Sequence, residues 1–236
     1  MKGILYGIGV GPGDPELMTI KAINTITACD IIAVPDSGSE KHVALDIAYR
    51  HIGDKPVLHL DLPMTHDVSE LQKKRFEAAA TICSQLDMGR KVGFLTLGDP
   101  MIYSTYSYLH TIIVSRGYTV TVIPGVTSFC AAAAALGEPL CEGGQTLHIV
   151  PATYTDSEKL LLQEGTKVFM KSGRKLCEMI THISKQNRRA FIAQRIGMDG
   201  EKLYRDVREL RELRDPNKET DTDYFSIIIA KEGNAK

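Results

Sequence analysis

The sequence predicts an α/β protein of two domains, with a mostly parallel sheet in the first domain and a mixed sheet in the second. In the first half, apolar and β-branched runs alternate with helix-like segments, as in sheets whose parallel strands are joined by right-handed crossovers. In the second half the strand-like runs follow each other more closely, which indicates an antiparallel component. Two early runs end in glycine-containing turns, and ligands bind at such carboxyl ends of strands in open α/β sheets.

Composition and charge narrow the class of protein. The chain has 236 residues, of which 43% are hydrophobic and 24% charged, as is ordinary for a globular protein. A net charge of −1 gives no overall field for nucleic acid or an anionic membrane, so we expect neither as a partner. The N-terminus lacks a secretory pattern, and the longest apolar run, residues 128–136, is too short to span a bilayer. The five cysteines are scattered without a C-x-x-C pair, which predicts reduced thiols in the cytoplasm rather than a disulfide framework or zinc site.

The chain opens with a strand that runs into a glycine loop, followed by a helix expected over residues 16–28. This order suggests a dinucleotide-binding fingerprint, but Pro12 and Asp14 stand where the third glycine of G-x-G-x-x-G would be needed. The loop also lacks the Lys-Ser/Thr pair of a phosphate-binding P-loop. We therefore expect the loop to approach a ligand other than a phosphate.

The next segments continue the alternation of strands and helices. Asp67 or Ser69 is expected to cap a long helix that ends near Gly89. The other predictions are strands at 30–35 and 56–60 and a helix at 41–51.

The apolar run over residues 92–97 predicts a buried strand, and it stops at Gly98-Asp99-Pro100. Glycine lets the backbone approach another group closely, and proline blocks further strand pairing. A helix is expected from about 103 to 115, followed by a strand at 118–123. The turn at Gly98 is thus a candidate ligand site, although an ordinary strand-to-helix turn has the same pattern.

The domain boundary is placed where residues 124–128 break the alternation, which gives domains 1–124 and 125–236. Thr127 or Ser128 is expected to cap an alanine-rich helix over 129–136. Further on, the sequence predicts strands at 146–151, 166–171, 189–194 and 224–230, and helices at 157–163 and 174–185.

The side chains exclude several kinds of chemistry. There is no G-x-S-x-G elbow, no H-E-x-x-H and no other ligand-spaced cluster, so we expect no serine hydrolase and no dedicated metal site. His59 and His66 flank Asp61 and are interpreted as unrelated surface histidines. Asp99 could act as a general base, but beside glycine and proline we favour a turn-capping role. The remaining features suit a reaction driven by a reactive cosubstrate, in which the protein positions its partners.

Three motifs, in order, resemble those of the tetrapyrrole (corrin/porphyrin) methylase family. They are G-x-G-x-G-P-G-D-P-E-L-x-T near the start, L-G-D-P-M-I-Y-S-T in the middle, and P-G-V-T-S-F before the alanines. Within the family, L-P-M-T, D-P-M-I-Y-S-T-Y-S-Y-L, I-V-P-A-T and V-F-M-K-S-G-R look most like the precorrin-2 and cobalt-precorrin-2 C20-methyltransferases. The resemblance covers nearly the whole chain.

The resemblance implies two α/β domains with S-adenosyl-L-methionine held in a cleft between them. It also implies methyl transfer to the C20 meso carbon of a tetrapyrrole, precorrin-2 or cobalt-precorrin-2, in corrin ring biosynthesis, by a homodimer. The family's usual pattern has a second glycine where this chain has Leu97. By motif matching, the residues expected to bind the cofactor are Pro12, Leu97, Gly98, Asp99, Ile102, Thr127, Ser128, Met170, Lys171, Ala193, Arg195 and Tyr224.

The substrate carries many carboxylates, which local basic and polar groups must hold because the chain as a whole is almost neutral. The candidates are Lys171, Arg174 and Arg195, with Tyr103, Ser104 and Tyr106 as hydrogen-bond donors. Other members of the fold act on other tetrapyrrole positions, on a protein, as diphthine synthases do, or on ribosomal RNA. A nucleotide-sensing module without activity is a further alternative. The balanced charge argues against an RNA substrate.

Overall fold

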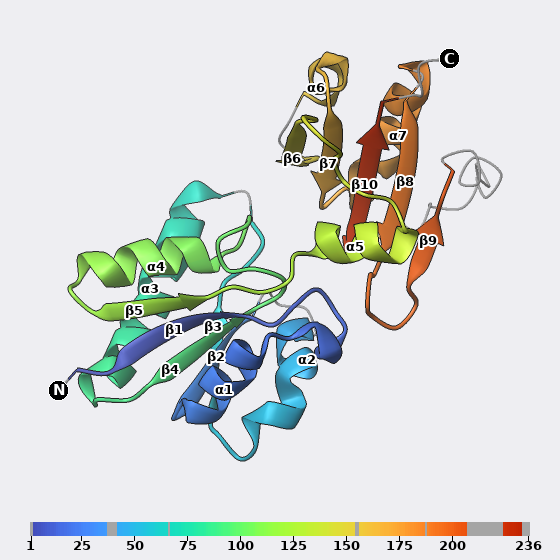
Figure 1. Cartoon of the computed structure of the whole chain (residues 1–236). Coiled ribbons are helices and arrows are strands. Elements are labelled where there is room, and N and C mark those ends of the chain that lie inside the picture. The colour runs from blue at the N-terminus through green and yellow to red at the C-terminus, as the bar shows by residue number, and fades with distance from the viewer. Residues whose placement is uncertain are drawn as a thin grey trace. The chain divides into compact units, whose positions relative to one another are not determined.

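A computed structural model describes residues 2–36, 42–65, 67–153, 156–186, 188–206 and 224–232, without the side chains of Ser157, Arg174 and Cys177. The chain forms two compact units, Met1–Thr127 and Ser128–Lys236, here called the N-terminal and C-terminal units (Figure 1). The boundary expected after Pro124 lies just before this division. In the part of the chain that is described, no helix combines the length and the apolar character needed to cross a membrane.

The N-terminal unit is built on a sheet of five parallel strands in the order β3-β2-β4-β1-β5 (Figure 1). The order agrees with a parallel sheet whose strands are joined by helical crossovers. Its strands are β1 (Ile4–Gly9), β2 (Ile31–Asp36), β3 (Val57–Asp61), β4 (Val92–Thr96) and β5 (Thr119–Ile123). Its helices are α1 (Ile20–Ala28), α2 (Val43–Ile52), α3 (Val68–Asp87) and α4 (Tyr106–Ser115).

Helices cover both faces of this sheet. Neighbouring residues of a strand point to opposite faces, so each strand contributes side chains to both cores. Phe94 packs in a core with residues of α3 and α4, such as Ile82 and Leu109. Leu95, the next residue of β4, packs in a second core with residues of α1 and α2, such as Ile26. A sheet buried on both sides explains why β4 reads as a continuous apolar run.

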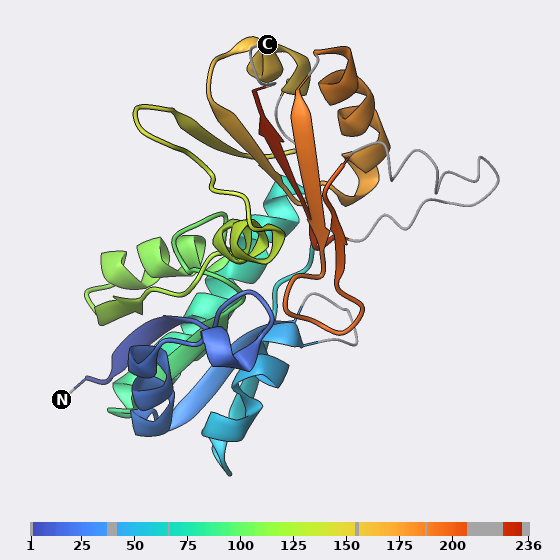
Figure 2. The ribbon, with the colours of Figure 1, turned by 45° about the vertical axis from the view of Figure 1, so that its right-hand side comes forward.

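The C-terminal unit has a mixed sheet in the order β6-β7-β10-β8-β9. Only β6 and β7 pair in parallel, and the other neighbours are antiparallel. Figure 2 gives a second view of the ribbon, in which β10 (red) runs beside β8 (orange). The strands are β6 (Leu147–Pro151), β7 (Thr166–Met170), β8 (Arg189–Gln194), β9 (Lys202–Tyr204) and β10 (Ser226–Lys231). The helices are α5 (Ser128–Leu136), α6 (Ser157–Leu162) and α7 (Leu176–Lys185).

The structure confirms the α/β class with its parallel and mixed sheets, and it corrects three local expectations. The helix expected over 16–28 is a 3-10 turn at Pro15–Leu17 followed by α1, because the Thr19 hydroxyl accepts from the Ala22 N–H and starts the helix there. The helix expected from 103 begins at Tyr106 instead, since Tyr103 has a φ of 48° that no right-handed helix accommodates.

The third correction concerns the start of α5. Thr127 precedes this helix, but its Oγ1 is buried without a hydrogen-bond partner among the described residues, so its side chain is not a cap. By contrast, Asp67 caps α3 as expected, because its Oδ1 accepts from the Ser69 and Glu70 N–H groups at 2.8 and 3.2 Å.

Candidate active site

The glycine turn after β4 is hydrogen-bonded to the glycine loop after β1. The Gly98 N–H donates to the Gly11 carbonyl at 2.7 Å, and the Val10 N–H donates to the Thr96 carbonyl at 3.0 Å. Gly11 and Gly98 have φ values of 82° and 71°, the left-handed region that glycine adopts without strain. The two loops expected to bind a ligand are therefore parts of one piece of structure at the carboxyl edge of the parallel sheet.

The Gly125 backbone packs directly against this pair of loops. A Cβ on Gly125 would lie 2.2 Å from the Gly98 carbonyl oxygen, and one on Gly9 would lie 2.6 Å from the same atom. A Cβ on Gly98 would meet nothing nearer than the Val126 oxygen at 4.0 Å, although Gly98 itself is buried. Glycine is required at 9 and 125 for packing, whereas a Cβ at Gly98 would have room among the described residues.

The Asp99 carboxylate links the turn after β4 to the backbone of Gly125. Its Oδ1 accepts from the Met101 N–H at 2.8 Å, and its Oδ2 accepts from the Gly125 N–H at 3.0 Å. Both oxygens thus accept from backbone donors, one two residues away and the other 26 residues away along the chain. This arrangement is the turn-holding role that we favour over general-base catalysis.

The other expected cofactor residues of the N-terminal unit border the same turn. Pro12 is buried directly after Gly11. Leu97 packs its side chain against the core of α1 and α2, which leaves its backbone on the side of the turn. The core thereby accommodates a leucine side chain at this position. Ile102 is 37% exposed, and its N–H donates to the Asp99 carbonyl at 3.4 Å.

The three residues expected to donate hydrogen bonds to a substrate differ in exposure and in their contacts. Tyr103 is 45% exposed beside the turn. The Ser104 hydroxyl accepts from the Tyr106 N–H at 3.1 Å and so holds the start of α4. Tyr106 is a correction: it is fully buried, its ring packs on Phe94, and a Cβ on Gly7 would lie 2.0 Å from it. Burial raises the pKa of Tyr106 far above its ordinary value, and the side chain is part of the core rather than a donor to a substrate.

In the C-terminal unit, one edge of the mixed sheet gathers the remaining expected residues. Since β10 is antiparallel to both β7 and β8, its start lies beside the ends of those two strands. The Ser172 N–H donates to the Ser226 carbonyl at 3.1 Å, and the Arg195 N–H donates to the Phe225 carbonyl at 3.1 Å. This edge brings together Met170, Lys171, Ala193, Arg195 and Tyr224.

Polar and cationic groups are fixed along this edge. The Lys171 Nζ lies 5.8 Å from the centre of the Tyr224 ring, and Tyr224 is 42% exposed. The Arg195 Nε donates to the Asp199 carbonyl at 2.7 Å, which orients the guanidinium. The buried amide of Gln194 donates to the Ser226 hydroxyl at 3.1 Å. The backbone of Arg174 follows in a 3-10 turn, Gly173–Lys175, while its side chain lies outside the described structure.

Backbone strain marks both edges independently of any motif. Among the described residues, the three non-glycine residues with positive φ are Tyr103 at 48°, Lys171 at 58° and Arg195 at 52°. Each belongs to the residues expected to contact cofactor or substrate. Left-handed conformations of this kind cost roughly 1–3 kcal/mol and cluster at binding and catalytic sites.

Sequence reasoning missed the packing role of two residues at the first edge, Gly9 and Gly125. Both glycines stand in motifs that were recognised, but their role depends on contacts between distant loops, which spacing does not reveal. Gln194 and Ser226 lie in the segments 193–195 and 224–226, whose backbone was expected to border the cofactor.

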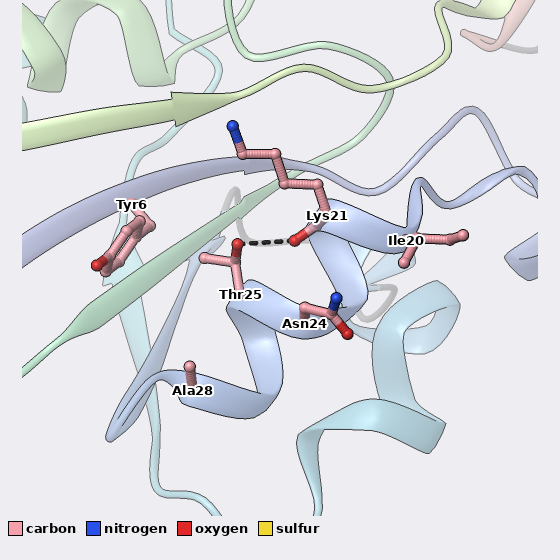
Figure 3. A pocket seen from close by; sticks show the side chains of 6 residues that line it. All are labelled: Tyr6, Ile20, Lys21, Asn24, Thr25 and Ala28. Carbon is pink, nitrogen blue, oxygen red and sulfur yellow. Dashed lines mark hydrogen bonds between the residues drawn. The ribbon is translucent and has the colours of Figure 1, made fainter.

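A separate pocket of about 490 Å³ lies beside α1 and is lined by Tyr6, Ile20, Lys21, Asn24, Thr25 and Ala28 (Figure 3). Figure 3 shows the Thr25 hydroxyl turned back to the Lys21 carbonyl, to which it donates at 2.7 Å. The lining has one cation and no acidic or nucleophilic partner for it. We therefore favour the glycine turn over this pocket as the candidate active site.

Comparison with curated proteins finds relatives across the length of the chain. The chain is 33% identical to a probable cobalt-precorrin-2 C(20)-methyltransferase of Methanocaldococcus jannaschii, over 96% of this chain and 95% of that protein. It is 29% identical to the cobalt-precorrin-2 C(20)-methyltransferase of Salmonella typhimurium, over 97% and 96%. It is 35% identical to the cobalamin biosynthesis protein CobIJ of Mycobacterium tuberculosis over 73% of this chain, but spans only 36% of that longer protein.

Solved structures show the same fold. A cobalt precorrin-4 methyltransferase superimposes with a TM-score of 0.77 at 21% identity, covering 97% of this chain and 94% of that one. A uroporphyrin-III C-methyltransferase of Thermus thermophilus, crystallised with S-adenosylhomocysteine, gives 0.71 at 18% identity, with 98% of each chain covered. The profile of the Tetrapyrrole (Corrin/Porphyrin) Methylases matches residues 4–211. With a family match over most of its length and relatives that align with it from end to end, the chain belongs to the tetrapyrrole (corrin/porphyrin) methylase family.

Proposed function

We propose that this protein is an S-adenosyl-L-methionine-dependent methyltransferase that methylates C20 of precorrin-2 or cobalt-precorrin-2 during corrin ring biosynthesis. The observation that carries the proposal is the end-to-end match to two relatives named for this reaction. The cofactor is supported by the family and by the S-adenosylhomocysteine in the Thermus thermophilus structure. A match of this length makes the family alternatives, methylation of a protein or of RNA, weaker candidates.

The glycine turn fits a bound cofactor on structural grounds. Gly98 is buried, yet a side chain placed there would project into space that the protein leaves unfilled. The surrounding backbone is held by the Asp99 carboxylate and by the hydrogen bond to Gly11. We propose that Pro12, Leu97, Gly98, Asp99 and Ile102 bind the cofactor through this backbone.

We propose further cofactor contacts at two places: the passage from Thr127 to Ser128, and the edge of the mixed sheet shared by β7, β8 and β10. Thr127 is included because its buried Oγ1 lacks a hydrogen-bond partner among the described residues. Lys171 and Arg195 are included because their strained backbones hold them at the edge shared by β7, β8 and β10. The full second set is Thr127, Ser128, Met170, Lys171, Ala193, Arg195 and Tyr224.

The chemistry demands positioning rather than a strong base. The cofactor supplies a sulfonium methyl group that is already electrophilic, and the C20 meso carbon of a partly reduced tetrapyrrole is enamine-like. The protein must align the two partners and exclude water. The rigid turn at Gly98 suits that role, since Asp99 uses both carboxylate oxygens to hold backbone N–H groups. Substrate carboxylates are assigned to Lys171, Arg174 and Arg195, with Tyr103 and Ser104 beside the turn.

Calorimetry with S-adenosyl-L-methionine tests the cofactor site. Gly98→Val should abolish binding, because its side chain would fill the unoccupied space. Gly53→Val is the matched control: Gly53 also has a positive φ, 61°, and open surroundings, but it lies in the turn before β3. The control separates backbone strain from a blocked site. Binding by a folded Gly98→Val protein would refute this assignment.

The substrate is tested by incubating enzyme and cofactor with metal-free or cobalt-loaded precorrin-2. Mass spectrometry of the pigment should show the gain of one methyl group, and the preferred form identifies the substrate. Cofactor binding without methylation of either pigment would leave the family assignment intact and refute the C20 reaction.

We also propose that the enzyme acts in the cytoplasm as a homodimer, as the family resemblance implies. Light scattering of the purified chain measures the oligomeric state, and a monomer at all concentrations would contradict the second part.

A further inference from the structure

Three potential metal ligands meet in the N-terminal unit, away from any motif used above. The side chains of Asp36, His42 and His59 each offer a ligand atom, and these atoms all lie within 4.8 Å of one another. The two imidazole rings are edge-to-face, with centroids 4.8 Å apart. The sequence was interpreted as giving His59 no partner, and His66, the histidine nearest to it in the chain, lies outside the described residues. The structure instead brings it to His42 of a different element.

The fold explains why these residues meet. Val34 and Val57 pack on the face of the sheet that α1 and α2 cover. Asp36 and His59 lie two positions further along the same strands, so the alternation of strand residues places them on that face too. The strands β2 and β3 pair in parallel, with Val34 opposite His59. His42 is the residue before α2, the helix that covers this face, so three elements each contribute one ligand.

We infer that Asp36, His42 and His59 form a binding site for a divalent first-row transition-metal ion. Two imidazoles and one carboxylate are the ligand set that suits zinc, cobalt, nickel and ferrous iron, and a three-ligand site leaves positions for water or another ligand. Magnesium and calcium prefer sites built from oxygen ligands alone and should bind poorly. Ligand atoms bound to one ion lie closer together than 4.8 Å, so the side chains close slightly around it.

The site is suited to a free ion rather than to an ion that a tetrapyrrole holds. A macrocycle occupies the four equatorial positions of its metal and leaves only two, on opposite sides. Three protein ligands that converge from one side cannot all bind such an ion. The inference is therefore independent of the proposed methyl transfer.

The position of the site suggests what an ion would do for the fold. The register pairs Ala33 of β2 with Phe94 of β4, and continuing it brings Asp36 level with Leu97. The ion would thus cross-link β2, β3 and the start of α2 beside the strand that ends in the glycine turn. Because a ligand that binds only the folded state stabilises it, metal should raise the melting temperature.

Cobalt(II) is the probe of choice, because its visible absorption reports the ligands and geometry around it. The full chain without a histidine tag is titrated with Co²⁺, and then with Zn²⁺ as competitor. We expect one equivalent of Co²⁺ to bind, with a d–d spectrum that Zn²⁺ abolishes and Mg²⁺ leaves unchanged. The melting temperature should rise with Co²⁺ or Zn²⁺.

His42→Ala and His59→Ala should each weaken binding by at least about 100-fold, more than the usual effect of losing a residue that only supports a ligand. His51→Ala, on α2 but outside the cluster, and Asp46→Asn, an exposed carboxylate of the same helix, are controls that should bind normally. Circular dichroism confirms that each variant is folded. Absence of stoichiometric binding to the wild type would overturn the inference, as would binding that survives in both histidine variants.

Discussion

The two units build their sheet edges by opposite means. In the N-terminal unit, glycine removes side chains, so that the backbones at Gly9, Gly98 and Gly125 nearly touch. In the C-terminal unit, side chains are retained, and Lys171 and Arg195 accept a strained backbone. A parallel sheet supplies the first edge, and an antiparallel strand beside two others supplies the second.

This difference indicates which property each edge contributes. Close backbone packing gives a rigid surface without charge, which suits the proposed contact with a cofactor. Strained residues with cationic side chains supply charge in a fixed direction, which suits a substrate rich in carboxylates. Side chains added at the packed glycines of the first edge, Gly9 and Gly125, should therefore disturb folding, whereas substitutions at the second edge should mainly disturb binding.

The largest effect is expected from Gly125→Ala. Its Cβ would lie 2.2 Å from the Gly98 oxygen and 2.9 Å from the Gly9 Cα, and backbone cannot move aside as a side chain can. We expect the free energy of unfolding to fall by about 3 kcal/mol, measured by urea denaturation. Gly144→Ala is the control, because a Cβ there meets nothing within 4 Å. Equal stability of the two variants would show that the glycine packing is not required.

A buried lysine in the C-terminal unit provides the next test. The Lys167 ammonium group donates to the carbonyls of Gln163, Glu164 and Gly165 and is fully buried. Lys167→Met leaves these acceptors with fewer donors, and we expect a loss of about 2 kcal/mol in the free energy of unfolding. Lys185→Met, at an exposed site, should be neutral. A neutral Lys167→Met would mean that Arg188, which donates to two of the same carbonyls, suffices alone.

The same residue predicts a dependence on pH. Burial, reinforced by the nearby Arg188, lowers the pKa of Lys167 from 10.5 to about 8. Between these values the unfolded chain binds the proton more tightly than the folded one, so this group makes stability rise with pH. The stability of the wild type relative to Lys167→Met should therefore increase from pH 8 to 10.5. A difference that stays constant with pH would contradict the lowered pKa.

Lys171→Gly tests the strained edge, with a smaller effect on folding. Relief of the left-handed backbone is offset in part by the greater chain entropy of glycine, so we expect stability to be unchanged or to rise by up to about 1 kcal/mol. Cofactor affinity measured by calorimetry should fall. Lys73→Gly, inside α3, should instead lose about 1 kcal/mol. A marked loss of stability in Lys171→Gly would show that the residue serves folding rather than binding.

The smallest perturbation is thiol labelling of the native protein. The cysteines of the N-terminal unit, Cys29 and Cys83, are buried, and burial raises the pKa of the Cys29 thiol to about 11. Cys130 and Cys141 of the C-terminal unit are exposed. Among these four cysteines, peptide mass mapping after brief labelling at pH 8 should find Cys130 and Cys141 modified and Cys29 and Cys83 unmodified. Rapid reaction of Cys29 would indicate that the N-terminal unit opens readily.

Much of the fold could be predicted because local pattern and global structure agree. The apolar run of β4, the Asp67 cap and the alternation of strands and helices are signals carried by neighbouring residues. The start of α4 could not be read in this way, because Tyr103 adopts a backbone conformation that its residue type disfavours. Tyr106 looked like a polar site residue, yet the absence of a side chain at Gly7 admits its ring into the core.

The candidate site shows the same limit. Gly98 and Asp99 could be identified from a turn signal and a family motif, and their partner Gly125 could not, since it is 26 residues away from Asp99. The meeting of Asp36, His42 and His59 follows from strand pairing and from the start of α2, which no spacing in the sequence encodes. Residues brought together by tertiary structure are the part that sequence reasoning misses.

The bond from Gly125 to Asp99 has one more consequence. Gly125 stands two residues before Thr127, where the first unit ends and the chain passes into α5. The segment that leads from the first unit into α5 and the glycine turn at Gly98 are therefore both held by the Asp99 carboxylate. A substitution that removes the Asp99 carboxylate would therefore release both the glycine turn and the segment that leads into α5.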